Sequence, residues 1–137
     1  MNTELLLAAV VVQVALTIAV FVVLAIRKAK ALKNGDVDLK KAALHNDAWP
    51  DYVLLISNNI QNQFQTPVLF YALCFGFIVM DAVDTLALAG AWTYVVSRLV
   101  HGYVHTTSNY VPVRMRVFTL GVVALIFMTG LLAIRLV

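Results

Sequence analysis

Imidazole and guanidinium groups recur along one face of a segment that is otherwise apolar. They follow one another at steps of four, three, four and three residues, in the series Tyr94, Arg98, His101, His105 and Ser108. These steps match helical periodicity, so the five side chains share one helix face. Ionisable groups within an apolar helix usually face the interior of a bundle or a wet cavity. The stripe therefore predicts either a polar ligand site or a set of structural hydrogen bonds.

The spacing of the two histidines also allows a metal or haem site, because residues at i and i+4 can ligate one ion. The sequence shows no evident third ligand for His101 and His105. We therefore expect no metal site, and absorbance and metal analysis of the purified protein would decide this.

A second polar run, from Ser57 to Thr66, contains six asparagine or glutamine residues. An unpaired amide costs about 1–3 kcal/mol when buried, so six amides facing lipid would oppose insertion by roughly 10 kcal/mol. Asn58, Asn62 and Gln65 share a face at i, i+4 and i+7 spacing. We expect this face to meet other helices or a ligand, with simple packing between helices as the competing interpretation.

Two cations stand where apolar segments begin or end: Arg27 closes the first and Arg114 opens the last. Counted along their helices, Asn62 and His101 lie roughly 15 and 10 Å deep from the same side. These groups predict a partly hydrated pocket suited to an anion in one half of the membrane. In the competing interpretation, Arg114 is only a cytoplasmic charge that determines the orientation of the chain in the membrane.

The elements that must position these groups are membrane-spanning helices. The chain is 62% apolar and 12% charged over 137 residues, whereas soluble domains carry roughly 25% charged residues. The formal charge of +3 is too small for a nucleic-acid surface. The sequence thus predicts an all-α integral membrane four-helix bundle, one domain over residues 1–137. Its helices are expected at about 5–26, 52–80, 85–107 and 113–136.

Lysine and arginine residues concentrate on one side of this bundle. Six lie in the first loop and two, Arg114 and Arg116, follow the third helix, whereas Arg135 stands alone at the other side. Because cytoplasmic loops are enriched in these residues, we expect both termini outside the cytoplasm.

Two motifs resemble one membrane protein family. The run Asn62-Gln63-Phe64-Gln65-Thr66-Pro67-Val68-Leu69-Phe70-Tyr71 resembles the second-helix signature of its bacterial members. The run from Arg98 through His101 and His105 to Asn109, followed by Pro112, Arg114 and Phe118, looks like the same family's third and fourth helices. The family is MAPEG, the membrane-associated proteins in eicosanoid and glutathione metabolism.

The resemblance implies a homotrimer in the bacterial inner membrane that binds glutathione between subunits and acts on small lipophilic electrophiles. By position, Arg114 would stabilise the glutathione thiolate. His101 or His105 would then donate a proton to the leaving group. The glutathione-binding positions would be those matching the family's first three helices: Arg27, Asn58, Asn62, Gln65, Arg98 and His105. A second hypothesis, of a different class, is a non-catalytic protein of this fold that binds a lipid, a small anion or a membrane partner.

Overall fold

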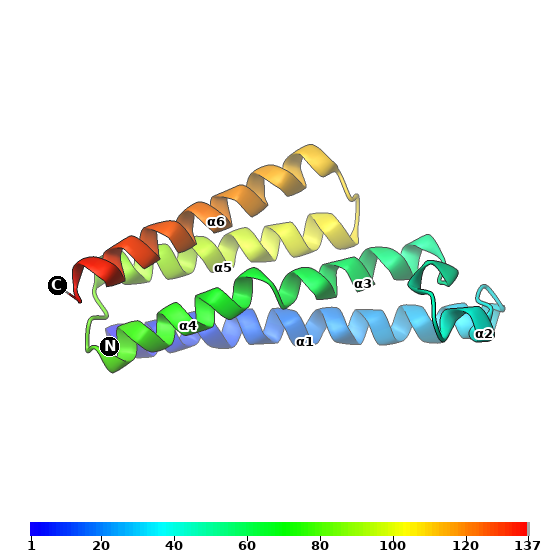
Figure 1. Ribbon diagram of the computed structural model, residues 1–137, viewed down its shortest axis with the longest axis horizontal. Coiled ribbons are helices and arrows are strands. Elements are labelled where there is room, and N and C mark those ends of the chain that lie inside the picture. Colours follow the sequence, from blue (N-terminus) through cyan, green and yellow to red (C-terminus); the bar gives the residue numbers. More distant parts are fainter. Residues whose placement is uncertain (137) are drawn as a thin grey trace.

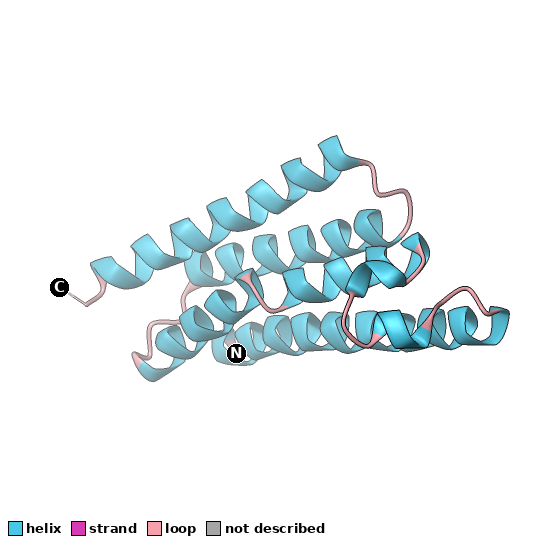
Figure 2. Ribbon diagram, turned by 45° about the vertical axis from the view of Figure 1, so that its right-hand side comes forward, coloured by secondary structure: helices cyan, strands magenta, loops and turns pink. Residues whose placement is uncertain are grey.

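The computed structural model describes residues 1–136 as helices joined by short connections, with no strand in that range (Figure 1). The chain runs the length of the molecule four times (α1, α3 with α4, α5 and α6), and Figure 2 shows the resulting bundle of helices from a second side. The elements in order are α1 (Asn2–Asn34), α2 (Leu39–Ala42), η1 (Asn46–Ala48), α3 (Asp51–Gln63), α4 (Thr66–Val79), α5 (Thr85–Thr106) and α6 (Val111–Ile134).

Both ends of the described chain lie at the same end of the bundle, and α2 lies at the other (Figure 1). Both chain ends lie together because the number of passes is even. We call the end with the two chain ends the terminal end, and the end with α2 the loop end. The predicted third and fourth helices agree with α5 and α6 to within two residues at every boundary.

The first helix is longer than predicted. It continues beyond residue 26 to Asn34, because the chain from Arg27 to Lys33 is made of arginine, lysine, alanine and leucine, which favour helices. At 33 residues it measures about 50 Å, which exceeds the roughly 30 Å hydrocarbon layer. It ends at Gly35, whose φ of 73° is the left-handed conformation that commonly closes a helix.

The prediction of one continuous helix over 52–80 is wrong. The chain breaks between α3 and α4, where Gln65 adopts φ −96° and ψ −88°. The cause is Pro67 in the first turn of α4: it has no N–H to bond the carbonyl of Gln63, four residues earlier, and its ring clashes with that carbonyl, so α3 cannot continue through it. A helix break therefore lies in the middle of the second pass, where Figure 1 shows a thin connection between α3 and α4.

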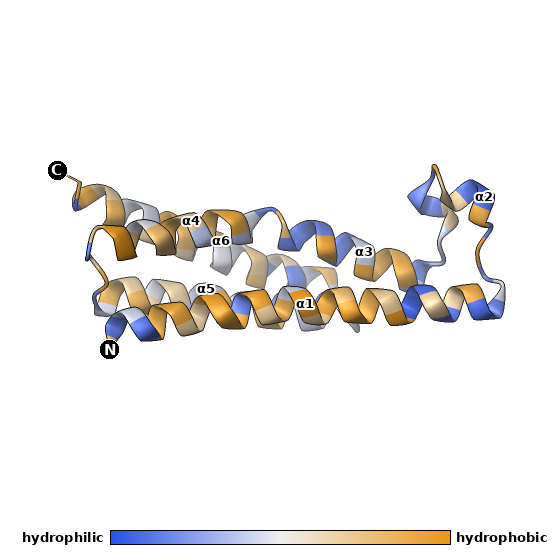
Figure 3. Cartoon of the chain, turned by 90° about the horizontal axis from the view of Figure 1, so that it is seen from below, coloured by the Kyte–Doolittle hydropathy of each residue, from blue (hydrophilic) through white to orange (hydrophobic). Residues whose placement is uncertain are grey.

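Two helices, α1 and α6, are long and apolar enough to cross a membrane by themselves. The other two passes carry more polar residues, which Figure 3 shows as blue bands on α3. Further blue bands mark the loop end of α1. The apolar core lies towards the terminal end, where Phe70 stacks on Tyr94 with ring centroids 4.6 Å apart. There Gly90 and Gly121 allow α5 and α6 to pack closely, since a Cβ at Gly121 would lie 2.6 Å from Ser97 Oγ.

Candidate functional site

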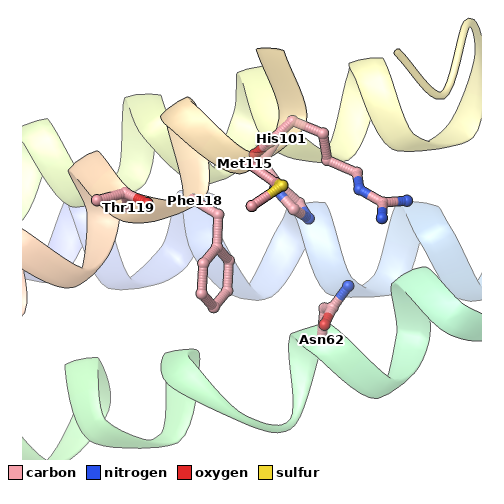
Figure 4. Close-up of a pocket in the computed structure, with 6 residues that line it drawn as sticks. Asn62, His101, Met115, Phe118 and Thr119 are labelled. Carbon is pink, nitrogen blue, oxygen red and sulfur yellow. Dashed lines mark hydrogen bonds between the residues drawn. The ribbon is translucent and has the colours of Figure 1, made fainter. Parts of the chain in front are cut away.

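A cavity of about 220 Å³ opens between α3, α5 and α6 (Figure 4). Asn62 faces it from α3, and His101 comes from α5, while the α6 residues form the opposite wall. Its lining residues are Asn62, His101, Arg114, Met115, Phe118 and Thr119. Three predicted site residues are thus brought together by three different helices.

Arg114 is placed at this cavity by the start of α6. Its Nη1 donates a hydrogen bond of 2.6 Å to Asn109 Oδ1. Asn109 has a φ of 49°, a left-handed conformation that asparagine tolerates better than most residues. Pro112 then falls in the first helical turn, where a proline costs no hydrogen bond. The local sequence therefore fixes both where α6 begins and where its first guanidinium points.

His101 is held in one tautomer by the backbone. Its Nδ1 lies 3.2 Å from the carbonyl oxygen of Arg114, and a carbonyl can only accept, so Nδ1 carries the hydrogen. Nε2 is buried and has no hydrogen-bond partner. In the neutral imidazole this nitrogen bears a lone pair, so a group bound in the cavity can give it a proton.

Arg98 lies beneath the cavity and is only 1% exposed. Its Nη2 donates to the backbone oxygen of Asn62 at 3.1 Å, and its guanidinium carbon lies 5.7 Å from the centre of the Phe118 ring. Nε and Nη1 have no partner. The two ion pairs found in residues 1–136 involve the N-terminus and Arg135, so neither Arg98 nor Arg114 has a carboxylate partner there.

His105 connects the stripe on α5 to α3. Its Nδ1 lies 3.5 Å from Asn62 Nδ2, and its ring packs edge-on against His101 with centroids 5.5 Å apart. In the described part of the chain, no third histidine, cysteine or carboxylate joins these two rings. The predicted stripe is buried at Tyr94, Arg98, His101 and His105, but Ser108 is exposed.

Of the predicted amide face Asn58, Asn62 and Gln65, only Asn62 faces the cavity. Asn58 and Gln65 are exposed, whereas Asn59 and Gln63 are buried. The buried amides form a chain: Gln13 Nε2 donates to Gln63 Oε1 and Gln63 Nε2 donates to Asn59 Oδ1, both at 3.0 Å. The packing of α3 against α1 determines that Asn59 and Gln63 face inward. Gln65 lies in the break after α3, so it no longer follows the helical spacing from Asn58 and Asn62.

Arg27 does not line the cavity. It lies on the extension of α1 towards the loop end, half-buried. Sequence reasoning did not single out Gln13, Met115 or Thr119. Gln13 was recognisable as a polar residue in an apolar span, but nothing in the sequence indicated which helix it would meet.

Four passes of helix, two of them long and apolar enough to cross a membrane, define a helical bundle of the membrane-protein type. The profile of the MAPEG family matches residues 5–134, nearly the whole chain, and the protein belongs to that family. No curated protein and no solved structure matches the chain significantly.

Proposed function

We propose that this membrane protein is a glutathione-dependent transferase or peroxidase acting on small lipophilic electrophiles. One observation carries the proposal: Arg114 lines a cavity with an unpartnered imidazole nitrogen, and Arg98 contacts two of its lining residues, Asn62 and Phe118. Neither arginine has a carboxylate partner in residues 1–136. Buried cations without counter-charges favour an anion. Membership of the family makes the glutathione thiolate the anion to test first.

The residues present fit part of glutathione. The tripeptide has two carboxylates and a thiol, which the Arg114 guanidinium, the Asn62 amide and His101 can bind through charge-assisted hydrogen bonds. A cavity of about 220 Å³ is below the roughly 300–1,000 Å³ of typical ligand sites. A neighbouring subunit would complete it, which supports the proposal of a homotrimer with the site at a subunit interface.

Bound glutathione would supply a thiolate nucleophile. The guanidinium of Arg114 stabilises negative charge on sulfur, because a nearby cation favours the thiolate over the thiol. Nε2 of His101 accepts the thiol proton and later donates it to the leaving group, while Nδ1 stays hydrogen-bonded to the backbone. Met115 and Phe118 give the cavity an apolar wall for the electrophile.

Conjugation of a generic aromatic electrophile by the purified protein tests this function. The variant Arg114→Ala should lose about 100-fold or more in kcat/KM, the usual effect of removing one preorganised group that stabilises a developing anion. Arg116→Ala is the matched control, because Arg116 is exposed and lies outside the cavity. Equal rates for the two variants, or no turnover by the wild type, would refute the proposal.

A second candidate function is binding without catalysis, and the neutral side chains of α3 favour it. Between Ser57 and Gln65 the chain offers amides but no carboxylate to pair with the ammonium group of glutathione. A ligand of the native state raises the melting temperature by mass action. Stabilisation by glutathione without turnover would support this function, and turnover would exclude it.

The proposed setting is the bacterial inner membrane, with both termini outside the cytoplasm. Protease protection of tags placed at the two termini checks the orientation.

A further inference from the structure

The break between α3 and α4 lies inside the bundle, where an interrupted helix is costly. The last carbonyls of α3 and the first amides of α4 lose their helical partners. Hydrocarbon offers no water to replace them, so each must be satisfied by protein. The structure shows one side chain that bonds a freed carbonyl, that of Arg98, and two that hold side chains on either side of the break.

Two residues of α5, one helical turn apart, hold the two ends of the break. Arg98 Nη2 donates to the backbone oxygen of Asn62 on the last turn of α3, at 3.1 Å. Tyr94 Oη donates to Thr66 Oγ1, on the first residue of α4, at 3.2 Å. Tyr94 is itself fixed by its stacking on Phe70. From the other side, Gln13 of α1 donates to Gln63.

The charge of Arg98 is suited to its place. The C-terminal end of a helix carries roughly half a negative charge, and a cation there is stabilising. Arginine presents five donors in a rigid fork, so it can bind a carbonyl while its charge faces the end of the helix. The residue whose carbonyl it binds also presents its side chain to the cavity and to His105.

We infer that Arg98 is a positioning residue: it clamps the end of α3 and thereby aims the Asn62 amide into the cavity. Arg98 itself does not line that cavity. The sequence-based prediction placed Arg98 among the direct ligands of glutathione, and the two roles make different predictions. The inference deepens the proposed function, and it rests on that function only for its binding readout.

The test compares Arg98→Met, Arg98→Lys and Tyr94→Phe with Arg116→Met as the control for loss of an exposed cation. The first readout is hydrogen exchange of the segment 62–68 in the full-length protein, which needs no ligand. Losing the clamp should speed exchange there about five- to tenfold in Arg98→Met, the local opening expected when one hydrogen bond is lost. Lysine should restore most of the protection, because it keeps a donor and the charge. Tyr94→Phe should speed exchange on the α4 side of the break.

The second readout is the Kd for glutathione in Arg98→Met, Asn62→Ala and the double variant. Asn62→Ala keeps the backbone oxygen and removes only the side chain. If Arg98 acts through that side chain, Arg98→Met weakens binding about tenfold alone but has no further effect in the Asn62→Ala background. Additive losses would show that Arg98 binds the ligand directly and would overturn the inference.

The two proposals fail in different ways. If wild type does not bind glutathione, the proposed function fails while the exchange data still decide the role of Arg98. Unchanged exchange of segment 62–68 in Arg98→Met, relative to Arg116→Met, overturns the inference whatever binds. Arg98→Met should remain folded, because an apolar side chain of similar length replaces a buried cation without a counter-charge.

Discussion

The two ends of this bundle are built on opposite principles. At the terminal end, apolar side chains fill the space between α4, α5 and α6, and the Arg135 guanidinium is paired with Asp84 and the backbone oxygen of Ala82. At the loop end, α6 diverges from the other helices (Figures 1 and 2), and buried polar atoms of Arg98 and His101 lack partners.

The difference separates stability from binding. Unpartnered donors and an open cavity lower the free energy of unfolding, so they point to a function such as ligand binding. Burial of apolar side chains at the terminal end offsets this loss of stability. Substitutions at the terminal end should therefore act on stability, and those around the cavity should act on ligand binding with little effect on stability.

The largest contrast is expected from one substitution made at both ends. Met128 is fully buried in the apolar core, whereas Met115 lines the cavity and is 61% exposed. Met128→Ala should cost about 2–4 kcal/mol, because it leaves a void among packed side chains. Met115→Ala should cost less than about 0.5 kcal/mol. Denaturation of the two variants in the same detergent measures the difference, and equal losses would contradict the division.

A smaller loss is expected from filling the close contact between α5 and α6. In Gly121→Leu the new side chain meets Ser97 Oγ, which already donates to the Tyr94 carbonyl. Overpacking of this kind costs about 1–3 kcal/mol. Gly130→Leu on the same helix is the control, since a Cβ there has nothing within 4 Å. A melting temperature of Gly121→Leu that matches the control would show that the helices do not depend on this contact.

At the loop end, a substitution should weaken ligand binding and leave stability almost unchanged. Asn62 is half-buried, and its amide makes one long contact with His105. Asn62→Ala should therefore change the free energy of unfolding by less than about 0.5 kcal/mol while weakening glutathione binding about tenfold, as expected for one lost polar contact. Calorimetric titration and thermal unfolding of the same preparation check both numbers. A destabilised variant with normal binding would reverse the assignment of the two ends.

The smallest effect concerns pH at the terminal end. The backbone N–H of Ala87 donates to Asp84 and, with Arg135, lowers the pKa of this carboxyl below its usual range. A lowered folded-state pKa means that the charged form stabilises the protein above the unfolded pKa of about 3.9 and that this contribution is lost as pH falls through the folded value. The melting temperature of wild type should exceed that of Asp84→Asn near neutral pH, and the difference should vanish in acid. If the difference in melting temperature persisted in acid, it would arise from the packing and hydrogen bonds of the side chain and not from its charge.

Much of the fold was predictable because the length of an apolar segment indicates a membrane-spanning helix, and the spacing of its polar residues indicates which face they share. The stripe on α5 was located from spacing alone, and burial of Arg98, His101 and His105 confirms it. The family membership and the helical membrane fold are likewise confirmed. Charge patterning predicts which side of the membrane each end faces, and that orientation stays a prediction.

The break in the second pass was missed although its signal was present. The pair Thr66-Pro67 begins α4 in the same way that Val111-Pro112 begins α6. The polar residues before Pro112 were interpreted as a helix boundary, whereas those before Pro67 were interpreted as the polar face of one continuous helix. The amide register was missed for a different reason. Whether Asn58 or Asn59 turns inward depends on how α3 packs on α1, and a single sequence does not contain that contact.

The shared location of the two chain ends has a practical consequence (Figure 1). Copies of this protein can be joined head to tail by a flexible water-soluble linker, without an added crossing of the bilayer. Such concatenated chains would carry a chosen number of intact and altered units. Activity as a function of that number would then count how many units must cooperate to form one working centre.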